Sequence, residues 1–171
     1  KEIKTRKVTN VQLKKIMEHT THTVEETYVI AKGLVHDILK HRAEDEKQAV
    51  VVALYGELGS GKTTFAQKIA SELGVSKTVI SPTFIIERVY KINVGVFTHF
   101  IHIDAYRLEN ADELLHLGFK DIVSDHKNFI AIEWAEKVEE LLPKDTIKIY
   151  FEHVSEGERQ IVIKSKSKVQ K

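Results

Sequence analysis

Cysteine is absent from this 171-residue chain, and proline occurs only twice. The absence of cysteine excludes disulfide bonds and thiolate metal sites. No apolar run approaches the roughly 18 to 20 residues needed to cross a bilayer, so no membrane span is expected. The opening segment KEIKTRKVTN has no apolar stretch behind its positive charges, so we expect no signal peptide and favour the cytoplasm.

An excess of one sign of charge is also missing. The chain carries 26 Lys and Arg residues against 25 Asp and Glu residues, a formal net charge of +1. Proteins that hold nucleic acid by bulk electrostatics carry a strong basic excess or a basic stripe. We therefore expect no DNA binding, and we expect any RNA to be held mostly by a partner. The composition, 42% hydrophobic and 30% charged, is typical of a single globular domain.

The segments at the two ends of the chain differ from the middle. Residues 1–22 are polar and weakly patterned, and they predict either an extension or a marginal helix. The main domain is expected over residues 23–165. The lysine-rich residues 166–171 are interpreted as a frayed tail rather than an RNA-binding arm.

Helical and strand patterns alternate through the main domain. Apolar residues recur at helical spacing over 24–39, after a capping box of Thr23 and Glu26. The run AVVVALY, residues 49–55, is typical of a buried parallel strand. The further expected elements are a helix ended by Gly74, two strands joined near Asn93 and Gly95, a short helix ended by Gly118, a strand over 128–133, a helix over 134–143, and a hairpin that turns at Glu156 and Gly157.

Residues 56–63, GELGSGKT, match the phosphate-loop pattern G-x-x-x-x-G-K-[ST] between an expected strand and an expected helix. Glycines let backbone N–H groups turn onto phosphate oxygens, and the helix N-terminus adds partial positive charge. Lys62 is expected to neutralise the β- and γ-phosphates, and the Thr63 hydroxyl to ligate Mg2+. The sequence thus predicts a single-domain α/β P-loop NTPase with a mostly parallel central sheet, flanked by helices, and an antiparallel hairpin portion.

Two acids follow apolar strands downstream of this loop. HFIHID ends at Asp104 and NFIAIE ends at Glu133. An acid after a strand is usually a surface turn, but beside a phosphate loop such an acid holds Mg2+ or orients water. His102 is interpreted as a structural histidine. In SPTF, residues 81–84, Thr83 is placed either in a switch-like loop that reaches the nucleotide or in an ordinary turn.

The segments GELGSGKTT, SPTF, HIDAYRL, ELLHLGF and IEW, in this order, resemble the TsaE family (also called YjeE) over residues 23–163. The family is the small ATPase of bacterial tRNA threonylcarbamoyladenosine modification. The resemblance implies ATP and Mg2+ as cofactors, the TsaB and TsaD proteins as partners, and contact with tRNA through that complex. Hydrolysis by the chain alone is expected to be slow, because no arginine finger is evident and a partner can complete the site.

The resemblance also implies roles for single residues. It makes Asp104, Glu133 and Lys62 catalytic, and Thr63, Glu133 and Asp104 the metal-binding residues. The residues implied to bind ATP are Gly59, Ser60, Gly61, Lys62, Thr63, Thr64, Thr27 and Arg159. The residues implied in switching or partner contact are Ser81, Pro82, Thr83, Tyr106, Arg107 and Trp134. From the residues alone, Tyr106 and Arg107 equally suit a packing pair, and Trp134 suits a core position.

Three other functions remain open at this point. A small-molecule P-loop kinase is the rival enzyme, although no arginine cluster suitable for a lid occurs late in the chain. A GTPase is disfavoured because no N-K-x-D signature is present. A non-catalytic subunit whose ATP state controls docking is the third possibility.

Overall fold

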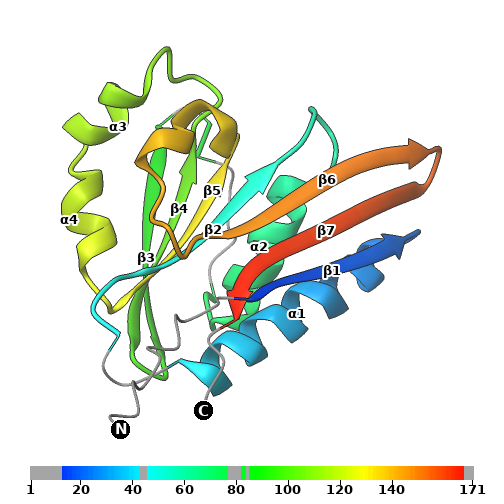
Figure 1. The fold of residues 1–171 in the computed structure, drawn as a ribbon, viewed down its shortest axis with the longest axis horizontal. Helices are drawn as coiled ribbons and strands as arrows, with labels where there is room; N and C mark the ends of the chain where they lie inside the picture. Colours follow the sequence, from blue (N-terminus) through cyan, green and yellow to red (C-terminus); the bar gives the residue numbers. More distant parts are fainter. Residues whose placement is uncertain (1–12, 43–45, 77–81, 84, 168–171) are drawn as a thin grey trace, which may run out of the picture.

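The structure, a computed structural model, describes residues 13–42, 46–76, 82–83 and 85–167, which form an α/β fold around a seven-stranded sheet (Figure 1). The strands are β1 Leu13–Thr21, β2 Val50–Tyr55, β3 Glu87–Val94, β4 Phe97–Asp104, β5 Asn128–Glu133, β6 Ile147–Ser155 and β7 Glu158–Ser167. The helices are α1 Val24–His41, α2 Lys62–Glu72, α3 Ala111–His116, α4 Phe119–Ser124 and the 3-10 helix η1 Ala135–Leu141. Across these described ranges, no helix has the length and apolar character that a membrane span requires.

The sheet is mixed, with strand order β1-β7-β6-β2-β5-β4-β3. The four central strands β6, β2, β5 and β4 are parallel, whereas β1 with β7, β7 with β6, and β4 with β3 pair antiparallel. The sheet as a whole is therefore mixed rather than mostly parallel, although its centre is parallel as expected. Both predicted hairpins join the same sheet as the parallel strands, and β1 adds a third antiparallel pairing at the edge.

Helices cover both faces of the central strands. Along β2, Val52 and Leu54 pack into a core with α1 and α2, while Val51 and Ala53 pack into a second core with α3, α4 and η1. Successive residues of a strand point to opposite faces, so a strand covered on both sides must be apolar throughout. This confirms the interpretation of AVVVALY as a buried parallel strand.

The glycine-rich loop connects the carboxyl end of β2 to the start of α2, in the order that the sequence predicts. Helix α2 begins after Gly61, whose φ of +107° lies in the left-handed region. At the other end Gly74 has a φ of +79°, and its N–H donates to the Ser71 carbonyl at 3.1 Å. A glycine at this position satisfies a carbonyl that the last turn leaves open, and the prediction that Gly74 ends the helix is confirmed.

The N-terminal segment is a strand where the sequence suggested an extension or a marginal helix. Strand β1 pairs with β7 along its whole length, from Leu13 opposite Ser167 to Thr21 opposite Arg159. Neither alternative includes this pairing, because local apolar spacing does not reveal a pairing partner at the other end of the chain. Residues 1–12 lie outside the described residues.

Other boundaries shift less. Lys166 belongs to β7, so the frayed tail expected over residues 166–171 does not begin at this residue, and residues 168–171 lie outside the described part. The helix expected over residues 134–143 is a 3-10 helix over Ala135–Leu141. Helix α1, the β3–β4 hairpin, the end of α3 before Gly118, strand β5 and the β6–β7 hairpin are confirmed. Helix α4 was not predicted.

Candidate functional site

The two strand-end acids lie side by side at the edge of the sheet where the glycine-rich loop begins. Asp104 and Glu133 are register partners on the parallel strands β4 and β5, and Glu133 is also the register partner of Leu54 on β2. Both acids are buried, at 2% exposure each. Parallel strands share their carboxyl edge, so the ends of β2, β4 and β5 bring both acids to one place.

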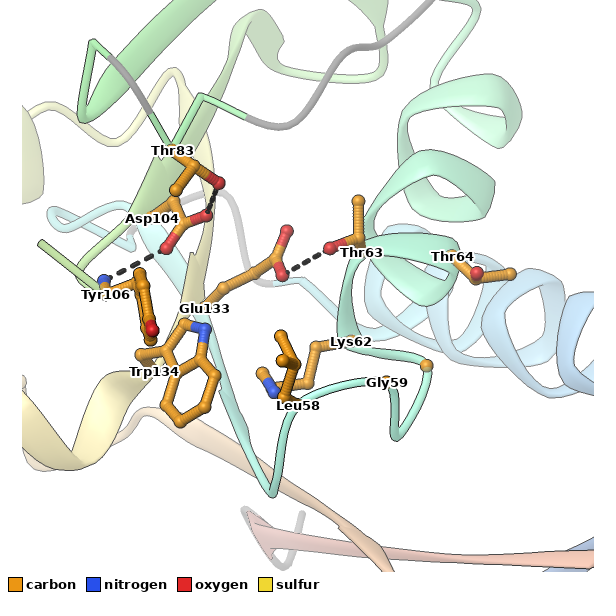
Figure 2. Close-up of a pocket in the computed structure, with 11 residues that line it drawn as sticks. Leu58, Gly59, Lys62, Thr63, Thr64, Thr83, Asp104, Tyr106, Glu133 and Trp134 are labelled. Carbon is orange, nitrogen blue, oxygen red and sulfur yellow. Dashed lines mark hydrogen bonds between the residues drawn. The ribbon is translucent and has the colours of Figure 1, made fainter. Parts of the chain in front are cut away.

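Each acid is oriented by hydrogen bonds (Figure 2). The Thr63 hydroxyl, in the first turn of α2, donates to Glu133 Oε2 at 2.6 Å. The Thr83 hydroxyl donates to Asp104 Oδ2 at 2.5 Å, and the Tyr106 N–H donates to Asp104 Oδ1 at 3.0 Å. The loop threonine and the threonine of the SPTF segment are therefore each tied to a different acid.

Lys62 lies folded against the loop that precedes it. Its Nζ donates to the Gly56 carbonyl at 2.6 Å and to the Glu57 carbonyl at 2.8 Å. Nζ also lies 3.9 Å from the centroid of the Trp134 ring, a cation–π contact. Burial lowers the pKa of the Lys62 ammonium, and the negative charge of Glu133 is the largest effect opposing that shift.

These groups line a cavity of about 430 Å³. The glycine-rich loop and the start of α2 contribute Leu58, Gly59, Gly61, Lys62, Thr63 and Thr64. The other lining residues are Thr83, Asp104, Glu133 and the two aromatic residues Tyr106 and Trp134, which we call the aromatic rim. The Tyr106 and Trp134 rings contact each other with centroids 5.0 Å apart. The cavity thus combines hydroxyls, carboxylates and one ammonium with an aromatic rim.

A second, smaller cavity of about 100 Å³ also borders the glycine-rich loop. Its lining includes Gly59, Gly61 and Thr64, which also line the larger cavity. Thr27 of α1 and Arg159 of β7 both line it as well. The loop therefore borders both cavities, and the fold brings Thr27 and Arg159 together from distant parts of the sequence.

The aromatic rim is fixed by the helix that follows it. Trp134 has a φ of +56°, in the left-handed region, and η1 begins directly after it. Tyr55, at the end of β2, donates a hydrogen bond to Glu139 of η1, and Lys148 of β6 pairs with the same carboxylate. Burial alone raises the pKa of Glu139, but the hydrogen bonds from Lys148 and Tyr55 outweigh it and lower the pKa. Helix η1 is thereby held against the strand that leads into the loop.

Most of the predicted site residues lie at the two cavities. Of the remaining ones, Arg107 is exposed and lines neither cavity. Pro82 is buried, and its carbonyl accepts the Ile85 and Ile86 N–H groups, so it shapes the turn next to Thr83. Ser81 lies outside the described residues. The roles of these residues stay predictions.

The motifs do not mark Leu58, and they leave His102 as a structural histidine with no link to the site. Leu58 is 81% exposed and lines the larger cavity, and nothing in the motif pattern distinguishes it from its neighbours. His102 is fully buried, and its Nε2 lies 2.8 Å from Glu133 Oε1. The H-x-D spacing was the available signal, since it places His102 and Asp104 on the same face of β4.

The fold and the site define a single-domain α/β protein whose mixed sheet carries a glycine-rich loop at its parallel centre. The family described as threonylcarbamoyl adenosine biosynthesis protein TsaE matches residues 21–161. The chain belongs to the TsaE family, which takes part in tRNA threonylcarbamoyladenosine biosynthesis.

Individual relatives agree with this assignment. The tRNA threonylcarbamoyladenosine biosynthesis protein TsaE of Bacillus subtilis is 38% identical over 124 residues, which are 72% of this chain and 75% of the relative. The protein of the same name from Treponema pallidum is 32% identical over 117 residues, 68% of this chain and 83% of the relative. The crystal structure of YdiB from Bacillus subtilis superposes with a TM-score of 0.65 at 30% identity, over 92% of this chain and 90% of that chain.

Proposed function

We propose that this protein is an Mg2+-dependent ATPase that acts with the TsaB and TsaD proteins to support tRNA threonylcarbamoyladenosine modification. The observation that carries the proposal is the 2.6 Å hydrogen bond between Thr63 and Glu133, which joins the loop threonine to a strand-end acid beside Asp104. A hydrolase needs an acid close to the phosphate loop, because the acid must act next to the terminal phosphate.

The loop suits a phosphate group. No side chain caps the N-terminus of the eleven-residue helix α2, and its first turn contains no acidic residue. By contrast, Thr23 caps α1 through its side chain. Uncapped N–H groups at a helix start bind anions, and the helix dipole adds to the attraction. Ser60 Oγ is buried without a hydrogen-bond partner among the described residues, so it is one more donor for phosphate.

The donor set beside the loop suits Mg2+. The Thr63 hydroxyl and the carboxylates of Glu133 and Asp104 are oxygen donors, which Mg2+ prefers over nitrogen or sulfur. Among the described residues, no group of three or more His, Cys, Asp or Glu side chains is close enough to hold a metal ion. Nucleotide-bound Mg2+ commonly takes only one or two protein ligands, and when bound it neutralises charge on the phosphates.

The two cavities suggest how ATP lies. We place the γ-phosphate in the larger cavity beside Asp104 and Glu133, and the adenosine in the smaller one between Thr27 and Arg159. Gly59, Gly61 and Thr64 line both cavities, so the phosphate chain would follow the loop from one to the other. Asp104 would orient the attacking water, since Thr83 and Tyr106 fix its carboxylate.

Partners and tRNA enter the proposal through the family. Membership in a tRNA-modification family supports TsaB and TsaD as partners and contact with tRNA through their complex. We expect slow hydrolysis by the chain alone, because no arginine of the described residues, Arg107 included, lines the larger cavity beside the acids. Exposed Leu58 at the cavity mouth is a natural partner contact.

The proposal is tested by separating ATP binding from turnover. Lys62→Ala should abolish ATP binding measured by calorimetry, because the ammonium that faces the phosphates is lost. Glu133→Gln and Asp104→Asn should keep binding measurable and lower phosphate release by about 100-fold or more, the usual scale for loss of a catalytic group. Glu140→Gln, an exposed acid on η1, is the matched control and should hydrolyse ATP as the unaltered chain does.

Normal phosphate release from both acid variants would reject their catalytic role. A small-molecule kinase would instead show little release without an acceptor and strong stimulation by one, and that result would replace the ATPase proposal with the rival enzyme.

A further inference from the structure

Glu133 is held from two sides by different elements. Its Oε2 accepts the Thr63 hydroxyl hydrogen at 2.6 Å, and its Oε1 lies 2.8 Å from Nε2 of His102 on β4. His102 has 0% exposure and Glu133 has 2%, so the contact between these two side chains is shielded from bulk water. Each carboxylate oxygen therefore has its own protein donor.

The hydrogen-bond chemistry fixes the direction of both bonds. An ionised carboxylate can only accept, so His102 Nε2 carries the hydrogen and donates it to Glu133. The other ring nitrogen, Nδ1, is buried with no hydrogen-bond partner among the described residues. Among the described residues, the His102 ring therefore makes its hydrogen bond to Glu133 alone.

Thr63 gains a defined orientation from this arrangement. A threonine hydroxyl has one hydrogen and two lone pairs. Because Glu133 takes the hydrogen, only lone pairs of Thr63 Oγ1 remain for a cation in the cavity that Thr63 lines. If the carboxylate turned away, the hydroxyl hydrogen would be free to point toward the cation, and the lone pairs would no longer be directed to it.

We propose that His102 is a positioning residue: it fixes the Glu133 carboxylate so that Glu133 orients the Thr63 hydroxyl for Mg2+. This inference rests on the proposed Mg2+-ATP site and deepens it. Outer groups that orient a ligand in this way commonly contribute 10- to 100-fold to metal affinity. A histidine that only fills the core would contribute to the stability of the fold but not to the metal.

The test uses three substitutions of His102 that keep, move or remove the side-chain donor to Glu133. His102→Gln places an amide N–H near the position of Nε2 and should keep the bond to Glu133. His102→Asn draws the amide back toward the position of Nδ1, and His102→Leu removes the donor. Phe100→Leu is the matched control, because Phe100 is also fully buried and lies two residues earlier on the same face of β4.

The readout is the affinity for the non-hydrolysable analogue AMP-PNP, measured by calorimetry with Mg2+ and with EDTA, alongside the thermal unfolding midpoint. We expect His102→Leu and His102→Asn to weaken Mg2+-dependent binding by about 10-fold or more and to leave binding in EDTA within about twofold. His102→Gln should recover most of the loss. Phe100→Leu should lower the unfolding midpoint and leave the ratio of the two affinities unchanged.

Each other outcome counts against the inference. A normal Mg2+ dependence in His102→Asn or His102→Leu would overturn it while leaving the proposed function intact. Failure of His102→Gln to recover binding would also overturn it, because the role is assigned to the donor. If the unaltered chain bound AMP-PNP with no dependence on Mg2+, the proposed function would fall, and this inference with it.

Discussion

Thr63 is the residue at which the glycine-rich loop and the acids meet. It lies in the first turn of α2, and its hydroxyl reaches across to the end of β5 to bond Glu133 (Figure 2). Lys62, one residue earlier, turns the other way and donates to carbonyls of the loop itself. Two consecutive residues thus make separate contacts, Thr63 with an acid and Lys62 with the loop.

Two substitutions of Thr63 distinguish the effect of losing its hydroxyl from the effect of a smaller side chain. Thr63→Ala removes the hydrogen bond to Glu133 and the proposed metal ligand, so it should weaken the binding of Mg-ATP by about tenfold or more, the cost of an unmade buried polar contact. Binding of ADP in EDTA should change far less. Calorimetric titrations under the two conditions make the comparison.

Thr63→Ser is the matched control for that comparison. Serine keeps the hydroxyl and loses one methyl group, so its Mg-ATP affinity should stay within about threefold of the unaltered chain. An equal loss for Mg-ATP and for metal-free ADP in Thr63→Ala would contradict a metal-binding role for this side chain.

At the scale of single residues, the sequence predicts the parts of the site that motifs mark. Asp104 and Glu133 were expected at strand ends, and both lie there as register partners. The hydrogen bond from His102 to Glu133 could not be predicted, because it joins neighbouring strands diagonally and depends on their register. The position of Leu58 at the cavity could not be predicted either, because it depends only on the path of the loop.

Elements depend on glycine in two different ways. Gly56 ends β2 with a φ of +139°, and a Cβ added there would lie 2.5 Å from the Phe151 carbonyl oxygen. Gly33 lies within α1, and apart from its chain neighbours and the nearby helix backbone no described atom lies within 4 Å of an added Cβ. Gly56 is required because the chain after β2 packs closely against β6. Gly33 has no such role, and it only raises the conformational entropy of the unfolded chain.

These two glycines predict opposite changes in stability. Gly56→Ala adds backbone strain and a clash with backbone that cannot easily move, so it should lower the free energy of unfolding by at least about 2 kcal/mol. Gly33→Ala should raise it by about 0.5–1 kcal/mol. For a chain of this size, about 1 kcal/mol shifts the unfolding midpoint by roughly 2–4 °C, which calorimetry measures readily. A Gly56→Ala protein as stable as the unaltered chain would mean that the loop is packed differently.

Whole elements were predictable where their pattern is local. Helix α1 has a capping threonine and helical apolar spacing, and β2 is apolar on both faces. Strand β1 was missed because it has no hairpin partner nearby in the sequence and lies at the sheet edge against β7. Tyr55 and Lys148 hold Glu139 of η1 from other strands, and no local pattern in the sequence predicts these contacts.

At the scale of the whole molecule, the sheet is wider than the region that the family match covers. The match spans residues 21–161, whereas β1 begins at Leu13 and β7 ends at Ser167 (Figure 1). Those outer parts pair with each other, so the N-terminal segment extends the sheet at its edge. The parallel centre, which carries the loop and both acids, lies away from that edge.

At this scale we propose that the chain supplies an ATP cycle, while its partners carry out transfer of the threonylcarbamoyl group. With purified TsaB and TsaD, tRNA and the threonylcarbamoyl donor, the measurement is the amount of modified tRNA formed per partner complex, with and without this chain. We predict about one product per complex without the chain and many with it, and no gain when Glu133→Gln replaces it. Equal yields with and without the unaltered chain would contradict the proposal that its ATP cycle supports turnover by the partner complex.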